Sequence, residues 1–288
     1  MRILIAGCGY VGTALGKVLI SQGAKVWGLR RDAEALSALA SEGIQPIAAD
    51  LLDPKTLEKL PDVDAVVFCQ ALSRKTDNYF ETYTMGTRNL VAAYRSHPPQ
   101  RMVMISSTSV FSTNDGSWVT EQTSPAAVAY DSQESTANAQ ALLEAEAAVL
   151  LSKIPAVVFR LAGIYGPGRH RIGALKAGRM KPSLSEAYTN RIHREDIVSG
   201  MLLLLEKGVA GEIYIGADDC PTTQKEFYSW LCGQIGMKIP EPAAEASSRG
   251  HVSNKRCSNQ KIKELGLKLK YPSYREGYSE ILRQEAIA

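Results

Sequence analysis

The stretch ILIAGCGYVGTALGKVLIS, residues 3–21, decides the fold of this chain. A short apolar run (3–6) leads into the glycine-rich turn GCGYVG (7–12), and a helical pattern follows directly. A GxGxxG spacing alone is a weak signal, because glycines are common in turns. Between a strand and a helix, however, it is the fingerprint of a dinucleotide-binding turn. The first segment of the chain therefore predicts a dinucleotide site.

Each glycine of this turn has its own physical role. Gly7 permits the tight turn, Gly9 lets the backbone approach a pyrophosphate, and Gly12 allows the helix to pack closely on the strand. The first helical turn also offers free N–H groups and the positive end of the helix dipole to the phosphates. We therefore expect cofactor contacts from Gly7, Gly9, Tyr10, Val11 and Gly12.

The end of the second apolar run indicates which dinucleotide is bound, since it reads GLRRDAE (28–34). The guanidiniums of Arg30 and Arg31 suit a 2′-phosphate, through charge-assisted bonds. Asp32 is the competing interpretation, because an acid at this point bonds the ribose 2′-hydroxyl of NAD. It is better placed as the cap of the helix that follows. We predict NADP(H) as the cofactor, with NAD(H) as the alternative.

Strand and helix signals alternate through the first two-thirds of the chain. Apolar runs that predict buried parallel strands lie at 3–6, 25–29, 45–49, 65–69, 102–106 and 156–160. Helical patterns between them lie at 10–22, 32–42, 53–60, 76–96 and 132–152. This alternation predicts an α/β fold with a Rossmann-type, doubly wound parallel sheet.

The alternation weakens after residue 161, which suggests a second, smaller lobe. We predict a dinucleotide-binding domain over 1–161, to which a helix and a strand within 195–215 return. A smaller C-terminal substrate-binding lobe would then comprise 162–194 and 216–288, with helices near 222–235, 258–265 and 275–286.

Composition excludes several classes of protein. A net charge of +3 is too small to indicate nucleic acid or a membrane surface. No apolar run approaches the roughly 20 residues that span a bilayer. Scattered cysteines and histidines without ligand spacing indicate the reducing cytoplasm and no metal site. Residues 160–194, however, hold eight Lys or Arg against the single acid Glu186, which favours an anionic ligand over a merely solvated basic face.

Several motifs in order along nearly the whole chain carry a family resemblance. After AGCGYVG they are AADLLDP (48–54), MGTRNLVAA (85–93), ISSTSVFS (105–112), ALLEAE (141–146), FRLAGIYGPGR (159–169), TNRIHREDIV (189–198) and SNQKIKELGLKLKYPSY (258–274). With these motifs the chain resembles an atypical member of the extended short-chain dehydrogenase/reductases, the NAD(P)-dependent epimerase/dehydratase group.

The resemblance implies further cofactor contacts. Asp50 and Leu51 match the pair that contacts the adenine, although Asp50 also suits a helix cap. Gln70 and Ala71 match the loop after the fourth strand, which runs past the cofactor's riboses.

The resemblance also implies substrate contacts. Ser107 matches the Ser or Thr that bonds the reacting oxygen, although three neighbouring hydroxyls compete for that role. Arg169 and His193 lie in the substrate-facing motifs, where His193 is alternatively one of a surface pair with Arg194. Gly163 stands where relatives often have a substrate-contacting Asn, which weakens the case for a nucleotide sugar.

The Tyr-x-x-x-Lys pair that serves this family as base is absent. An isolated tyrosine has a pKa of about 10 and needs a nearby cation to act as a base at neutral pH. One alignment makes Tyr130 the acid/base residue, with Glu134 in place of the lysine. The other, anchored on ALLEAE, puts Asn138 and Leu142 at the two positions. A cation from elsewhere in the chain would have to come from a residue such as Arg74, Lys75 or Arg169.

Two functions stay open on this evidence. The first is an NAD(P)-dependent oxidoreductase or epimerase/dehydratase acting on a polar, anionic small molecule such as a nucleotide sugar. The second is a non-catalytic NAD(P)-binding sensor or regulatory protein, which the absent lysine favours. The substrate-loop motifs favour the enzyme, and the resemblance implies a homodimer through a helix pair that includes 132–152.

Overall fold

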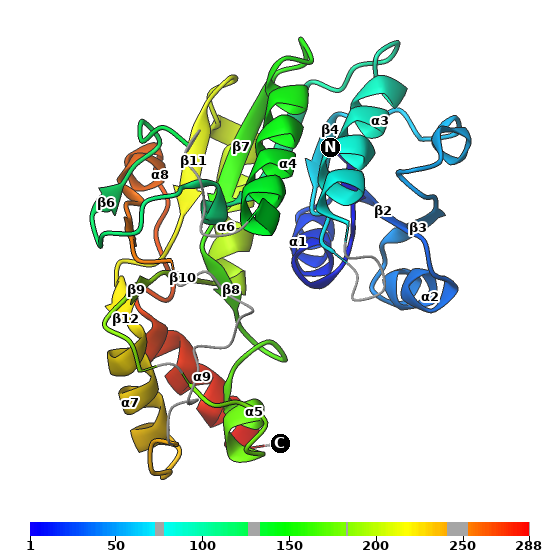
Figure 1. Ribbon diagram of the computed structural model, residues 1–288. Helices are drawn as coiled ribbons and strands as arrows, with labels where there is room; N and C mark the ends of the chain where they lie inside the picture. The colour runs from blue at the N-terminus through cyan, green and yellow to red at the C-terminus, as the bar shows by residue number, and fades with distance from the viewer. Residues whose placement is uncertain (73–77, 126–132, 183, 241–252, 288) are drawn as a thin grey trace.

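The structure is a computed structural model of the 288-residue chain. It describes residues 1–72, 78–125, 133–182, 184–240 and 253–287. Figure 1 shows a central sheet with helices on its faces, and a group of helices and short strands beneath one part of it.

The central sheet is parallel and has seven strands in the order β11-β7-β5-β4-β1-β2-β3. Their bounds are β1 Arg2–Ala6, β2 Lys25–Arg30, β3 Gln45–Ala48, β4 Ala65–Phe68, β5 Arg101–Ser107, β7 Ala156–Leu161 and β11 Ile213–Gly216. Strand order reverses between β1 and β4, which lie side by side, so a crevice opens at their carboxyl ends. The predicted doubly wound parallel sheet is confirmed.

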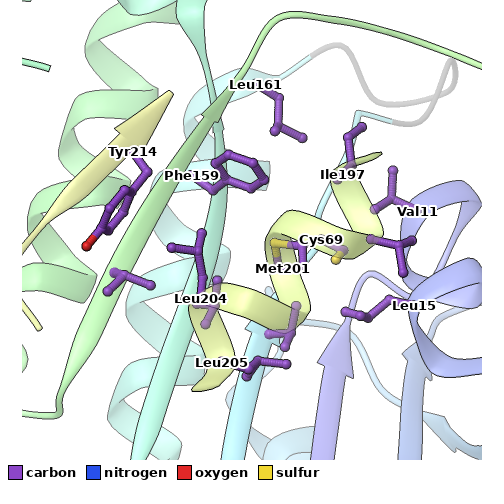
Figure 2. Close-up of a cluster of buried hydrophobic side chains, with 14 of the residues drawn as sticks. Val11, Leu15, Cys69, Phe159, Leu161, Ile197, Met201, Leu204, Leu205 and Tyr214 are labelled. Atoms are coloured by element: carbon purple, nitrogen blue, oxygen red, sulfur yellow. The ribbon is translucent and has the colours of Figure 1, made fainter. Parts of the chain in front are cut away.

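Helices cover both faces of this sheet, and the strands alternate their side chains between two cores. On one face α1 (Tyr10–Ser21) and α6 (Arg194–Lys207) pack on Ile3 and Ile5. On the other face α3 (Gly86–Ala93) and α4 (Gln133–Leu150) pack on Leu4 and Ala6. Figure 2 shows the first core, with α6 presenting Ile197, Met201, Leu204 and Leu205 beside Val11 and Leu15 of α1. Burial on both faces explains why these strands read as continuous apolar runs.

Two predicted helices are wrong in extent. In place of a helix over 53–60 there is a 3₁₀ turn, Pro54–Leu57. Pro61 disfavours a helical conformation at the residue before it, which keeps this segment short. Within 76–96 the chain forms a π-helical segment, Phe80–Met85, and then α3. The helix α2 (Ala33–Ser41) does follow Asp32 as predicted.

Short strand pairs build the second lobe, and none of them was predicted. These are β8 Gly163–Tyr165 with β10 Arg191–His193, β9 Tyr188–Thr189 with β12 Thr222–Thr223, and β6 Trp118–Val119 with β13 Arg256–Cys257. The helices α5 (Ile172–Lys176), α7 (Gln224–Gln234) and α9 (Tyr274–Ile287) lie together below the sheet in Figure 1. Their shared core is mostly aromatic and includes Tyr165, Phe227, Tyr274 and Tyr278.

The helix α8 (Gln260–Leu265) departs from the predicted division of the chain. Its sequence belongs to the predicted substrate lobe, but Ile262 packs into the sheet's core beside α6 and β11. This part of the chain therefore supports the sheet. Among the described residues, no helix combines the length and the apolarity that a membrane crossing requires.

Candidate functional site

A cleft of about 400 Å³ lies at the carboxyl ends of the strands where their order reverses. Loops after β1, β2, β3 and β4 line it. The structure brings together nearly every residue predicted to bind the cofactor; the lining includes Gly7, Gly9, Tyr10, Val11, Arg30, Arg31, Asp50, Leu51, Gln70 and Ala71. Gly12 lies behind the cleft, where a methyl group on it would stand 2.9 Å from Cγ2 of Ile5. That position matches its predicted packing role.

The glycine turn leaves room for a ligand because two of its residues lack side chains. Gly7 has a φ of +74°, and a methyl group on it would lie 2.7 Å from Cα of Gln70. At Gly9 a methyl group would lie 3.0 Å from Nη1 of Arg30. The loops after β1 and β4 thus approach backbone to backbone.

Asp32 caps α2, as predicted, because its carboxylate accepts the N–H of Ala35 at 2.9 Å. That bond, helped by Arg30, lowers the pKa of Asp32. Arg30 lies 3.2 Å from Asp32, and Arg31 lies 3.9 Å from Asp50. The two guanidinium side chains remain 32% and 48% exposed, so both have donors left for an anion in the cleft.

The loop after β4 is held from the π-helical segment and α3. The side-chain amide of Gln70 donates to the carbonyl of Thr82 at 3.2 Å, and its oxygen accepts from Thr87 at 3.3 Å. Asn89 donates to the carbonyl of Leu51 at 2.8 Å. The motif MGTRNLVAA contributed to the family resemblance, but these positioning roles were not predicted from the sequence. The polar residues at one face of that predicted helix were the available signal.

A second cavity of about 590 Å³ adjoins the cleft and shares Ile164 and Arg169 with it. It lies among β8, the loop before α5, β10, α7 and α9. Arg169, predicted to bind substrate, thus stands at the junction of the two spaces. The side chain is exposed, and its guanidinium lies 5.7 Å from the ring centre of Tyr10.

Tyr10 ties the glycine turn to the loop that carries Arg169. Its hydroxyl donates to the carbonyl of Pro167 at 3.0 Å, and the guanidinium of Arg194 lies 4.7 Å from its ring centre. Burial raises the pKa of Tyr10, so the hydroxyl stays a donor at neutral pH. Sequence reasoning assigned Tyr10 to the cofactor alone and missed this link.

His193 lines neither space, which does not fit the direct substrate contact predicted for it. Only 1% of the residue is exposed, because its ring is covered by Tyr165 and Tyr271, with centroids 5.2 and 4.1 Å away. Its Nδ1 caps α6 by accepting the N–H of Glu195 at 3.2 Å. Burial lowers its pKa to about 4, so the ring is neutral at pH 7.

Ser107 ends β5, on the same edge of the sheet as the cleft, but like His193 it is not among the residues that line the cleft or the second cavity. Its hydroxyl oxygen accepts the N–H of Ser109 at 3.1 Å, which leaves the hydroxyl hydrogen free to donate. Tyr130, the predicted acid/base residue, lies outside the described residues, as do Arg74 and Lys75.

A buried ion pair behind Ser107 fastens α4 to β5 and β7. Arg160 donates to both oxygens of Glu146, at 3.0 and 2.7 Å, and Ser106 donates to the same carboxylate at 2.6 Å. Leu142, one helical turn earlier, is only 3% exposed and packs in the sheet's core. The sequence motif ALLEAE contained Glu146, but nothing local identified Arg160 as its partner.

The model of the NAD dependent epimerase/dehydratase family matches residues 3–216. The chain belongs to this family. Protein YeeZ of Escherichia coli (strain K12) is 27% identical over 281 residues, which cover 94% of this chain and 96% of YeeZ. The 4-hydroxy-2-methyl-3-oxo-4-farnesyl-3,4-dihydroquinoline-1-oxide ketoreductase of Stigmatella aurantiaca is 30% identical over 267 residues, covering 86% of this chain and 79% of that enzyme. A solved structure, a candidate NAD-dependent epimerase/dehydratase from Methylobacillus flagellatus, is 31% identical, with a TM-score of 0.80 and coverage of 99% and 98%.

Membership of this family bears on the role of α4, because this helix contains both candidate positions for the family's lysine. On the alignment anchored on ALLEAE, the position expected for the family's lysine is the buried Leu142, and on the other alignment it is Glu134. A leucine in the core can neither hold a ribose nor supply a charge. Among the described residues, no group of three or more His, Cys, Asp or Glu is arranged to hold a metal ion.

Proposed function

We propose that this protein is an NADP(H)-dependent oxidoreductase that acts on a carbonyl group of an anionic small molecule. One observation carries the proposal: the cleft with the glycine turn, Arg30 and Arg31 opens beside a second, arginine-lined cavity through the shared residue Arg169. Family membership and the named activity of the Stigmatella aurantiaca ketoreductase support oxidoreductase chemistry. NAD(H) is the competing cofactor, and a nucleotide sugar the competing substrate.

The residues of the cleft fit a dinucleotide. The glycine turn lines the cleft next to the start of α1, where free N–H groups suit a pyrophosphate. Arg30 and Arg31 would bind a 2′-phosphate, since Asp32 is engaged as a helix cap. Asp50, Leu51, Gln70 and Ala71 would contact the adenosine and ribose parts.

The chain's own residues would then assist the reaction from two sides. A bound NADPH supplies a hydride. Ser107 would donate a hydrogen bond to the reacting oxygen, and the predicted acid Tyr130 would give the proton that turns the reduced oxygen into a hydroxyl. Arg169 lies at the junction of the cleft and the second cavity, where its guanidinium would supply a positive charge that a leucine such as Leu142 cannot supply. This charge would stabilise the negative charge that develops on the reacting oxygen.

The cofactor part of the proposal is tested by fluorescence titration with NADPH and NADH. The wild type should bind NADPH more tightly. Arg30→Ala should weaken NADPH binding by about 10- to 100-fold, the worth of one charge-assisted contact, and leave NADH nearly unchanged. Arg95→Ala removes the same charge from an exposed site outside the cleft and should change neither affinity. Tighter binding of NADH by the wild type would contradict the NADP(H) assignment.

The catalytic part is tested by single-turnover hydride transfer from bound NADPH to a panel of ketones, aldehydes and nucleotide sugars. Ser107→Ala should slow transfer with NADPH affinity preserved. Arg169→Gln should slow transfer even at saturating NADPH, and Arg169→Lys should recover part of the rate. Tyr130→Phe belongs in the same series, as the predicted acid/base residue. Wild-type rates in all of these variants would remove the residues from the mechanism.

A specific observation also favours a second function, a non-catalytic NAD(P)-binding sensor. On the alignment anchored on ALLEAE, the family's lysine position holds Leu142, whose side chain is buried in the sheet's core. On this alternative NADPH binds as described, but no member of the panel is reduced.

A further inference from the structure

The second cavity presents an unusual distribution of charge. Its lining contains three arginines, Arg169, Arg171 and Arg191, and no aspartate or glutamate among the residues that the structure describes there. Arg169 and Arg171 are exposed. Arg191 is different, because it comes from β10 and its guanidinium lies 3.7 Å from the ring centre of Phe227, on α7.

The guanidinium of Arg191 has no ion-pair partner within the described part of the chain, although the charge of Asp218 would favour its protonated form. The side chain of Arg191 takes part in no hydrogen bond or ion pair there, and Nη1 is buried without a partner. Burial lowers the pKa of this guanidinium, which reflects the free energy needed to keep a cation out of water. Contact with the faces of Phe227 and Tyr274 offsets only a part of that cost.

Asp218 is buried, and its side chain makes no ion pair with this arginine. Its N–H donates to the carbonyl of Arg191 at 2.7 Å. Oδ1 accepts from Cys220 at 3.1 Å, and Oδ2 is buried without a partner. Burial raises the pKa of Asp218 to about 8, so the carboxyl is mostly protonated at pH 7.

Several other polar side chains of the lining are engaged with the protein, whereas the amide of Gln224 and Nδ1 of His170 have no partner in the described part of the chain. Thr189 donates to the carbonyl of Thr222, and Asn190 bonds Lys255 and Cys257 through both ends of its amide. Tyr165 donates to the carbonyl of Ser273. Few groups are therefore left to bond the many hydroxyls of a sugar, whereas the walls offer aromatic faces from Phe227, Tyr228 and Tyr278.

From this arrangement we propose that Arg191 binds the carboxylate or phosphate of a substrate whose body is aromatic or otherwise apolar. The anion would supply the missing ion-pair partner, and the apolar body would pack against α7 and α9. Arg191 then determines specificity for organic anions over sugars. The inference rests on the proposed function, because it assumes that this cavity holds the substrate.

The test measures the binding of defined probes by calorimetry, with and without saturating NADPH. The probes are phenyl phosphate, benzoate, benzyl alcohol as the neutral analogue, inorganic phosphate, and UDP-glucose as the nucleotide sugar. We expect phenyl phosphate and benzoate to bind, the tighter of them identifying the anion, and the other three to bind at least tenfold more weakly. Failure of both aromatic anions to bind the wild type would overturn the proposal.

Variants of Arg191 separate recognition from a structural role. Arg191→Met should weaken the better aromatic anion by about 10- to 100-fold and, because it removes an unpaired buried cation, should raise the melting temperature of the free protein. Arg191→Lys keeps the charge and should bind with intermediate affinity, and it serves if the methionine variant fails to fold. Arg179→Met, an exposed arginine of the same lobe outside the cavity, is the matched control and should bind as the wild type does.

Asp218→Asn tests the alternative that the aspartate is the partner of Arg191. It should leave anion binding unchanged or tighter; loss of binding would contradict our assignment. Unchanged affinity in Arg191→Met, or UDP-glucose as the tightest probe, would also overturn it. NADPH affinity of the wild type is measured in the same series, so that failure of the cofactor proposal is recognised separately.

Discussion

At the scale of single residues, two glycines with similar positive φ values allow a test of how tightly the glycine turn approaches the loop after β4. Gly7 and Gly23 have φ values of +74° and +84°, but a methyl group meets the backbone of Gln70 only at Gly7. Both alanine variants should lose about 1–2 kcal/mol of stability from the left-handed backbone. Gly7→Ala should lose about 1–3 kcal/mol more from the steric clash.

The measurement is urea unfolding of the two variants with NADPH titration beside it. Only Gly7→Ala should weaken the cofactor. Equal stability losses at the two sites would show that the approach of Gly7 to Gln70 is not tight.

The positions of the residues in and near the glycine turn were the part of the candidate site that the sequence predicted best. These residues are local, so spacing alone placed Gly7, Gly9 and the cap Asp32 correctly. His193 shows the limit, because its burial under Tyr165 and Tyr271 depends on contacts across 28 and 78 residues of chain (193 − 165 and 271 − 193), which no local pattern contains. The same holds for Arg191, whose partner Phe227 comes from another element.

At the scale of elements, α4 is attached to the sheet by charge as well as by packing. Glu146 on α4 binds Arg160 on β7 with both side chains below 5% exposure. Glu146→Gln would leave Arg160 buried and unpaired, and should destabilise the protein by about 3–5 kcal/mol. Glu144, two residues earlier, pairs with Arg88 at the surface, so Glu144→Gln should cost less than about 1 kcal/mol.

Chemical unfolding of the two variants under the same conditions compares their free energies of unfolding. A loss in Glu146→Gln as small as that in Glu144→Gln would mean that the pair does not hold α4. Because Ser106 donates to Glu146 and precedes Ser107, a displaced α4 should also slow hydride transfer.

The lengths of the helices and strands explain why only part of the fold was predictable from the sequence. The six predicted parallel strands before residue 161 and the strand near 212–215 all form the sheet. The strands β6, β8, β9, β10, β12 and β13 have two or three residues each, too few for a period to emerge. Contacts between distant segments hold them in place: Val119, Ile192 and Cys257 pack in the core of the sheet, and Tyr165 packs in the aromatic core of the second lobe.

At the scale of the whole molecule, the two lobes meet at groups whose protonation depends on folding. Asp218 follows β11, the last strand of the sheet, and bonds the backbone of β10 in the second lobe. His193 and Asp196 lie at the same junction, and burial shifts their pKa values to about 4 and about 6. Asp196 therefore finishes titrating by about pH 7, and His193, whose pKa in the unfolded chain is about 6.5, finishes by about pH 7.5.

Above about pH 7, Asp218 should dominate the pH dependence of folding. Its pKa is raised to about 8 in the folded protein, so between pH 6.5 and 8 the folded state keeps a proton that the unfolded chain has lost. Its contribution to stability is complete below the unfolded value of about 4 and is lost as the pH rises toward 8. The free energy of unfolding should fall over pH 6.5–8 by at most about 1.4 kcal/mol per pH unit.

Asp218→Asn should flatten that slope, since the amide keeps the oxygen that accepts from Cys220 but carries no proton equilibrium. Asp219→Asn is the matched control, because Asp219 is partly exposed and pairs with Lys263, and its slope should equal that of the wild type. Urea unfolding at half-unit steps from pH 6.5 to 8 distinguishes the two. An unchanged slope in Asp218→Asn would place the titrating group elsewhere, and would mean that a charged Asp218 neutralises Arg191 in the free protein. An anionic substrate would then have to displace that charge, which makes this measurement a second, independent check on the role of Arg191.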